Sequence, residues 1–411
     1  MPDTPAGDQL AWVIDGAAGA TDEVMAAHFS ADFLAQVSAV VLRQTISGLG
    51  VITVEEILAS EPTQLAVQVS PTVGGPQIVS IQVGATGAHL IEGLLAQPAP
   101  GPAPTSWSEV KDRTARWAPD ASLLVAEVTA DGQLHETMSL DRDLAEPLGS
   151  AFKLYVLGAL TEAIEAGTVA WTDELAIEPQ LKSLPSGELQ DRPDGSTVTV
   201  LEAATKMISI SDNTAADMIA SRLGRAAIEA VLPQMGMTDS SIARNLPWLT
   251  TRELFSLKWG VDHEVLDRYR RAGREERQAI LDDLGTDALA RAATTLDPSS
   301  PVEIETVEWF ASPNELAAAH VWLDERAGHA GLGELRTVLG TNPGVRLDPS
   351  VWKRFSFKGG SEPGVFTVSW LLEHQDGRRF VVVLEAHDTA APLDEGEGAA
   401  IAQGIIDLAA P

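Results

Sequence analysis

The chain has 411 residues, 45% of them hydrophobic, so it is long enough to bury the cores of two or three domains. Its formal net charge of −31 argues against a nucleic-acid partner or an anionic membrane as partner. No cysteine is present, which excludes disulfides, thiolate metal sites and cysteine nucleophiles. The eight histidines show no metal-binding spacing, so we expect neither a metal nor another cofactor.

The N-terminal residues do not have the pattern of a targeting segment. Residues 1–8 lack the basic start and apolar stretch of a signal peptide, which favours a cytoplasmic protein if Met1 is the native start. Residues 62–91 carry no formal charge, but Pro71 and Pro76 interrupt this stretch. It therefore predicts strands and turns, not a membrane span.

Residues 1–97 predict a small α+β domain. Residues 22–47 have a helical period, because apolar side chains recur every four residues at Met25, Phe29, Phe33, Val37 and Val41. Strand-like segments follow at residues 51–58, 64–69, 77–83 and 89–97. By this pattern the domain resembles the cystatin or nuclear-transport-factor-like fold. It contains no catalytic constellation, so we expect it either to dock near the second domain and shape access or to bind a partner independently.

Residues 98–105 are rich in proline and predict an extended, semi-rigid linker. The second domain then spans residues 106–411, and it begins with a helix at residues 106–117 followed by two strands at 122–129 and 133–140. Residues 250–300 are predicted to form a helical insertion, in which the charged run 262–283 presents a solvated face.

The pattern S-x-x-K occurs three times, and its sequence context singles out Ser150 with Lys153. Ser150 opens an apolar helical run, whereas Ser108 and Ser350 do not. A serine at a helix N-terminus lies beside backbone N–H groups that can stabilise an oxyanion, and a lysine one turn later lies on the same face. By itself the motif also fits an ordinary N-cap serine.

Two further short motifs follow in the chain. Ser211, Asp212 and Asn213 precede a predicted helix and could serve only as its cap. Lys358, Gly359 and Gly360 lie in a predicted strand. The alternative to a functional role is a surface lysine followed by glycines at a bend.

Taken together, S-x-x-K, S-D-N and K-G-G resemble the S-x-x-K, S-D-N and K-T-G set of serine β-lactamases and penicillin-binding proteins. The resemblance is strongest to class A enzymes and extends over residues 107–411. It implies an α/β sheet layer beside a helical lobe. With its additional N-terminal domain, the chain looks most like the two-domain actinobacterial serine hydrolases of the type found in clavulanic acid biosynthesis.

The resemblance also implies catalytic roles. Ser150 would attack an ester or amide carbonyl, and Lys153 would take its proton. Ser211 would relay a proton to the leaving group with help from Lys358. The backbone N–H groups of Ser150 and Ser361 would form the oxyanion hole.

Substrate binding would involve Asn213, Gly359 and Gly360. The family usually has threonine or serine where this chain has Gly359, so a hydroxyl contact to a substrate carboxylate is missing. We therefore expect weak binding of ordinary penicillins. The expected substrate is a small-molecule ester or β-lactam-type compound.

The family's E-x-x-L-N motif, whose glutamate activates the deacylating water, has no match in residues 238–312. The conceivable substitutes have no motif of their own; they are Glu253, Glu303, Glu305 and Glu308. We therefore predict slow deacylation of β-lactams. Two alternatives remain open, a β-lactam-binding protein without turnover and a carboxypeptidase acting on peptidoglycan-like peptides.

Overall fold

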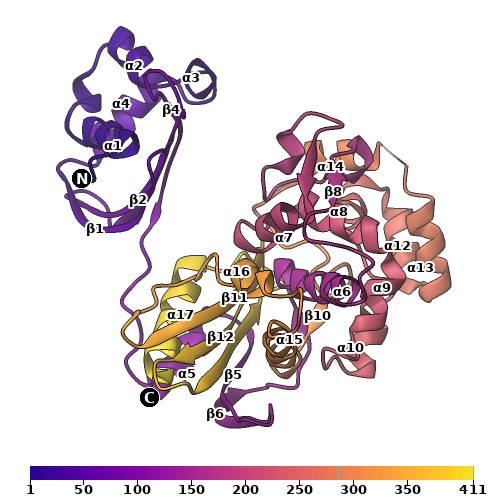
Figure 1. The fold of residues 1–411 in the computed structure, drawn as a ribbon. Coiled ribbons are helices and arrows are strands. Elements are labelled where there is room, and N and C mark those ends of the chain that lie inside the picture. Colours follow the sequence, from indigo (N-terminus) through magenta and orange to yellow (C-terminus); the bar gives the residue numbers. More distant parts are fainter. Residues whose placement is uncertain (286, 411) are drawn as a thin grey trace. The chain divides into compact units, whose positions relative to one another are not determined.

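The computed structural model describes residues 1–285 and 287–410, and the chain divides into two compact units, Met1–Gly101 and Pro102–Pro411 (Figure 1). Each unit buries its own hydrophobic core, as expected of a domain. No helix among the described residues is both long and apolar enough to cross a membrane.

The N-terminal unit combines short helices with an antiparallel sheet. The strands lie in the order β1-β2-β3-β4, so each pairs with its neighbour in sequence. Leu10, Phe29 and Leu65 are among the residues of its core. The helices are α1 (Pro5–Asp15), α2 (Asp22–His28), α3 (Ala31–Gln36) and α4 (Ala39–Gly48), and the strands are β1 (Ile52–Ser60), β2 (Gln64–Pro71), β3 (Gln77–Val83) and β4 (Ile91–Pro98).

The predicted helix at residues 22–47 is in fact three helices, so the prediction of one continuous helix was wrong. The backbone is extended at Phe29 and Val37, and the serine that follows each of them caps the next helix. The Ser30 hydroxyl accepts a hydrogen bond from the backbone N–H of Phe33, and such capping competes with helix continuation. Helix α1 was not predicted at all.

The C-terminal unit is built on a five-stranded antiparallel sheet in the order β11-β12-β13-β5-β6. Strands from the two ends of the unit therefore meet in its centre, where β5 pairs with β13. The bounds are β5 (Asp120–Val128), β6 (Leu134–Leu140), β11 (Trp352–Glu362), β12 (Val365–His374) and β13 (Arg379–His387). Strands β5 and β6 are close to the strands predicted at residues 122–129 and 133–140.

Alternate residues of the sheet face different cores. In β5, Leu123 and Val125 pack with α5 (Trp107–Trp117) and α17 (Glu395–Ala409), whereas Leu124 and Ala126 face α15 (Pro313–Arg326) and the helical lobe. Figure 1 shows α5 and α17 on one side of the sheet and α15 on the other.

The helical lobe surrounds α6 (Lys153–Glu165), whose first nine residues are all buried. A helix that is apolar on every side belongs in the middle of a domain. The remaining longer helices of the lobe are α7 (Val200–Ser209), α8 (Asn213–Leu223), α9 (Arg225–Val231), α10 (Asp239–Arg244), α11 (Thr251–Phe255), α12 (His263–Arg271), α13 (Arg274–Asp282), α14 (Ala288–Thr295) and α16 (Glu334–Leu339).

The charged run at residues 262–283 forms two helices, α12 and α13, which meet at Ala272 and Gly273. Its arginines are largely exposed, but Leu266, Tyr269 and Ile280 pack into the core. Before it, residues 256–260 form one π-helical turn, labelled η5. π-Helical turns are rare and often occur at functional sites.

Candidate active site

Ser150 lies in the 3₁₀ turn η2 (Gly149–Phe152), which leads directly into α6. It is half-buried at the entrance to the helical lobe. The two other S-x-x-K serines, Ser108 and Ser350, are exposed, and their lysines are exposed as well. The structure therefore distinguishes Ser150 from these two by its position.

The Lys153 amino group lies at the centre of the hydrogen-bond network around Ser150. Its Nζ is 3.0 Å from Ser150 Oγ and 3.1 Å from Ser211 Oγ. It is 2.6 Å from both the backbone oxygen of Ser211 and Oδ1 of Asn213. The first two motifs, which are about sixty residues apart in sequence, thus meet at one nitrogen atom.

Burial lowers the pKa of Lys153 well below its usual value, and the nearby positive charge of Lys358 lowers it further. A neutral lysine has two N–H donors and one lone pair. The two oxygens at 2.6 Å, which belong to a carbonyl and an amide, can only accept, so they orient the two N–H bonds. The lone pair is then free to accept the proton of a serine hydroxyl.

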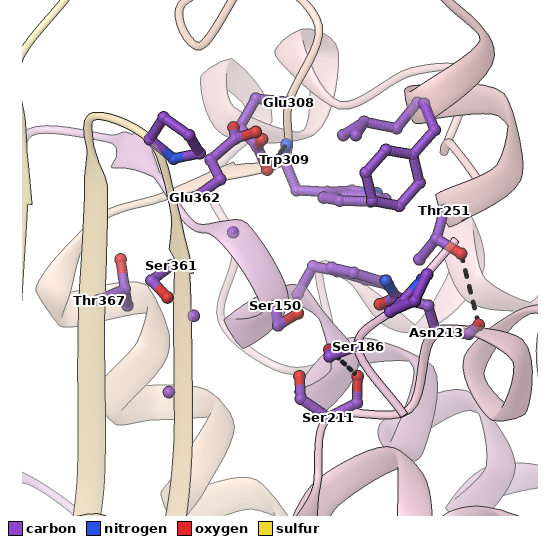
Figure 2. Close-up of a pocket in the computed structure, with 18 of the residues that line it drawn as sticks. Ser150, Ser186, Ser211, Asn213, Thr251, Glu308, Trp309, Ser361, Glu362 and Thr367 are labelled. Atoms are coloured by element: carbon purple, nitrogen blue, oxygen red, sulfur yellow. Dashed lines mark hydrogen bonds between the residues drawn. The ribbon is translucent and has the colours of Figure 1, made fainter. Parts of the chain in front are cut away.

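Ser211 has a left-handed backbone conformation, with φ of 58°. This conformation is uncommon for residues other than glycine and costs about 1–3 kcal/mol, so it needs support from its surroundings. The Ser211 backbone oxygen accepts hydrogen bonds from Lys153 Nζ and from the Ser186 hydroxyl at 2.8 Å (Figure 2). The Ser211 side chain is thereby held beside both lysines of the site.

The next two residues have different partners. Asp212 is fully buried and caps α8, and its carboxylate accepts backbone N–H bonds from Glu188 and Leu189. Asn213 uses its amide oxygen for Lys153 and its amide nitrogen for the Leu184 carbonyl at 2.9 Å. The capping interpretation of this motif is therefore correct for Asp212, and Ser211 and Asn213 additionally contact Lys153.

Lys358 approaches from β11, on the sheet side of the site. Its Nζ lies 3.0 Å from Ser211 Oγ and 2.5 Å from the Gly359 backbone oxygen. Burial lowers the pKa of Lys358 to about 7. The third motif is thus buried, and Ser211 Oγ lies within hydrogen-bond distance of both lysines.

Close backbone packing brings β11 against the Ser150 turn. A β-carbon added at Gly360 would lie 2.2 Å from the Leu148 oxygen and 2.5 Å from the Ser150 nitrogen. One added at Gly149, where φ is 49°, would lie 3.0 Å from the Ser361 nitrogen. Glycines at these two positions permit this close approach of β11 and the Ser150 turn, which is where the backbone nitrogens of Ser150 and Ser361 lie.

Gly359 lines the cavity but has little room for a side chain. A β-carbon there would lie 3.0 Å from the Phe357 ring. Phe357 itself is buried and packs on Trp370, with ring centroids 4.9 Å apart. The missing hydroxyl at this position therefore coincides with an aromatic ring that fills the space behind the strand.

Ser150, Ser211, Asn213 and Ser361 line a cavity of about 510 Å³ (Figure 2). Figure 2 shows Ser150 between Ser211 and Ser361, with Glu308 and Glu362 on the wall beside Trp309. Many lining residues are apolar, among them Phe152, Leu254, Phe255, Trp259, Leu296, Trp309 and Phe366. The charged residues that line it, among those described, are three acids: Asp297, Glu308 and Glu362.

Of the four glutamates considered from sequence, the structure places only Glu308 in this cavity. Glu253 caps α11 and pairs with Arg225, and Glu303 pairs with Arg270. Glu305 is exposed. The two partners of Glu308, which are Lys258 and Glu362, were not predicted. The available signal was Lys258, a lysine between the apolar residues Leu257 and Trp259.

The fold of the C-terminal unit is that of the class A-like β-lactamases, and the comparisons with known proteins agree. Residues 114–291 match the model of the β-lactamase enzyme family, and residues 1–88 match that of the ORF 12 gene product N-terminal domain. No curated protein matches the chain.

Several solved structures are similar to this chain over about three quarters of its length. A β-lactamase from Sphaerobacter thermophilus is 20% identical, with a TM-score of 0.51, and the match covers 74% of this chain and 98% of that one. A β-lactamase from Chitinophaga pinensis is 13% identical, with a TM-score of 0.48 and coverages of 74% and 98%. The protein PBP-A is 16% identical, with a TM-score of 0.47 and coverages of 76% and 98%.

The two lysines predict a bell-shaped pH dependence of Ser150 acylation. The rate should rise with pH as Lys153 loses its proton, well below the usual lysine range, because only the neutral amine accepts the serine proton. It should fall through about pH 7 as Lys358 loses the proton that it shares with Ser211. Pre-steady-state acylation rates across the neutral range measure both limbs. In Lys358→Arg the alkaline limb should disappear, because arginine stays charged; an unchanged limb would contradict the assignment.

Proposed function

We propose that the C-terminal unit is a serine acyl hydrolase that forms an acyl-enzyme at Ser150 with an ester or β-lactam-type substrate. The observation that carries this proposal is the 3.0 Å contact between Ser150 Oγ and Lys153 Nζ, in a buried site that favours the neutral amine. A nucleophile within hydrogen-bond reach of a base that is itself oriented by further groups is the arrangement needed for covalent catalysis.

Acylation would proceed by proton transfer between groups already in contact. Ser150 Oγ attacks the carbonyl carbon as Lys153 takes its proton, and the backbone N–H groups of Ser150 and Ser361 stabilise the oxyanion. Ser211, which contacts Lys153 and Lys358, passes the proton to the leaving group. Because the Asn213 amide is occupied by Lys153 and Leu184, we propose that it positions the base as well as bordering the substrate.

The residues that line the cavity favour a substrate with an uncharged, apolar acyl group. Aromatic rings from the insertion, Phe255 and Trp259, face the same cavity as Ser150, and the charged lining residues are acidic. The acidic lining residues offer a substrate carboxylate no positive partner, and Gly359 offers no hydroxyl to hold one. We therefore rank esters with an apolar acyl group above carboxylate-bearing penicillins as substrates.

Slow deacylation of ordinary β-lactams remains part of this proposal, because no E-x-x-L-N motif lies in residues 238–312. A role in β-lactam or clavam biosynthesis is likewise proposed, from the resemblance of the two-domain layout. The same missing motif favours a second candidate, a β-lactam-binding protein that is acylated once and does not turn over.

Intact-mass spectrometry tests the acyl-enzyme. After incubation with a panel of penicillins, cephalosporins and chromogenic esters of increasing acyl length, we expect one adduct per chain at Ser150. Esters with longer apolar acyl groups should react faster than acetate, because they fill the cavity. Ser150→Ala should form no adduct, since methyl cannot attack a carbonyl.

Ser350→Ala is the matched control, because that serine begins an exposed S-x-x-K pattern. It should be labelled like the unchanged protein. An adduct that persists in Ser150→Ala, or that maps to Ser108 or Ser350, would refute the assignment. Burst kinetics separate the two candidates: the binding protein releases one equivalent of product and stops.

A further inference from the structure

The cavity wall opposite Ser211 holds a buried group of one lysine and two glutamates that acylation does not use. Lys258 Nζ is 3.3 Å from Glu308 Oε2 and 2.5 Å from Glu362 Oε1. The side chains of Lys258, Glu308 and Glu362 are 0%, 1% and 15% exposed. Both carboxyl groups line the cavity that contains Ser150 (Figure 2).

Glu308 is fixed close to the candidate nucleophile by the residue that follows it. The Trp309 backbone oxygen accepts a hydrogen bond from the Leu148 N–H at 2.9 Å, two residues before Ser150. The Trp309 ring stacks on Phe152, with centroids 3.6 Å apart. The Trp309 backbone N–H donates a hydrogen bond to Glu308 Oε1 at 3.0 Å. The Glu308 carboxyl group is thereby held in the wall of the cavity that contains Ser150.

Glu362 approaches from the other side, because it directly follows Ser361 on β11. The group is thus bracketed by the turn that carries Ser150 and by the strand that carries the proposed oxyanion donor. A purely structural ion pair would need one carboxylate for one lysine. Two buried carboxylates with a single lysine leave a net negative charge, which is costly unless one carboxyl keeps a proton.

We propose that Glu308 is the general base that activates the water for hydrolysis of the Ser150 acyl-enzyme, with Glu362 and Lys258 as positioning residues that orient its carboxyl group. This inference rests on the proposed function. It deepens that function by supplying the deacylating base from a position that has no sequence motif.

Hydrolysis of the Ser150 acyl-enzyme consumes one water molecule. A water oxygen bonds to the ester carbon while Glu308 takes one of its protons. The bond between that carbon and Ser150 Oγ then breaks, and Oγ takes a proton from solvent in the cavity. Glu308 then releases to solvent the proton that it took from the water molecule. Ester and water thus become a carboxylic acid and free Ser150, and no other reactant is needed.

The surroundings of Glu308 predict the pH range in which it can act as a base. Burial raises the pKa of Glu308 well above its usual range, and the neighbouring Glu362 raises it further, against the opposing effect of Lys258. Asp297 on the cavity rim is exposed, and Lys153 and Lys358 lie on the Ser150–Ser211 side. Since the base form is the carboxylate, deacylation should be slow where Glu308 is protonated and should accelerate as pH rises.

The test measures decay of the acyl-enzyme after removal of excess substrate, by intact mass across a range of pH. Glu308→Gln keeps the shape of the side chain, so acylation should persist. Decay at alkaline pH should fall by about 10²–10⁴-fold and lose its dependence on pH. Glu362→Gln should shift the rising limb of decay to lower pH, because it removes the neighbour that raises the Glu308 pKa.

Glu305→Gln is the matched control, since Glu305 lies in the same segment but is exposed and does not line the cavity. Its decay profile should equal that of the unchanged protein. If an adduct forms but decays identically in Glu308→Gln, or if Glu362→Gln leaves the limb in place, this inference is overturned and the proposed function stands. If the unchanged protein forms no adduct, both are overturned.

Discussion

Replacing Lys153 by methionine is expected to slow acylation of Ser150 by about 10²–10⁴-fold, the usual cost of losing a positioned general base. Methionine is apolar and of similar length, so it suits a residue that is fully buried. The change removes the acceptor of the serine proton and the donor to Ser211 and Asn213. The measurement is the pre-steady-state burst with the best chromogenic ester from the panel.

Lys353→Met is the control for this change. Lys353 ends the S-x-x-K pattern that starts at Ser350, and it pairs with Glu373 on the surface. The Lys353→Met protein should be acylated at the same rate as the unchanged protein. Thermal unfolding should show that the Lys153→Met protein is folded. A folded Lys153→Met protein with a normal burst would show that another group takes the serine proton.

The parts of this site that could be predicted from sequence are those set by local spacing. Ser150 and Lys153 are one helical turn apart, so their proximity follows from helix geometry. Strands β5 and β6 were predictable because two strand-like segments flank a short turn. The three motifs meet because the fold places α6, α8 and β11 side by side, which the family resemblance implied and the hydrogen bonds at Lys153 and Ser211 display.

What could not be predicted depends on contacts between distant segments. Glu308 was one of four conceivable glutamates, but its partners Lys258 and Glu362 come from two other segments, and no periodicity relates the three positions. The prediction of one continuous helix over residues 22–47 failed for a different reason. Its apolar stripe has the helical period, but the cap formed by Ser30 is a local competitor that the period does not reveal.

Above the pH at which Lys153 has lost its proton, the two proposed chemical steps should respond to pH in opposite directions. Acylation weakens as Lys358 loses its proton near pH 7, whereas hydrolysis strengthens as Glu308 loses its proton at a pH well above the usual carboxyl range. The acyl-enzyme should therefore accumulate most near the maximum of the acylation profile, where Lys153 is neutral and Lys358 is still charged. A protein of this kind would behave as a slow hydrolase in alkaline buffer and as a near-stoichiometric acyl binder near that maximum.

Gly360→Ala is expected to lower the acylation rate by about 10²–10³-fold, comparable to loss of an oxyanion-hole donor. The added methyl group would lie 2.2 Å from the Leu148 oxygen and 2.5 Å from the Ser150 nitrogen, both backbone atoms that cannot rotate away. Strand β11 must then move from the Ser150 turn, so the two N–H groups no longer converge on one oxyanion. The burst amplitude and rate with a chromogenic ester measure the loss.

Gly333→Ala is the matched control, because Gly333 is exposed and an added β-carbon there meets no atom within 4 Å. It should keep full activity. Comparing substrates sharpens the argument: because the oxyanion hole stabilises the transition state, Gly360→Ala should reduce kcat/KM by the same factor for short and long acyl esters. A loss confined to long acyl groups would mean that the methyl group narrows the cavity and leaves the oxyanion hole intact, which would contradict the predicted displacement of β11.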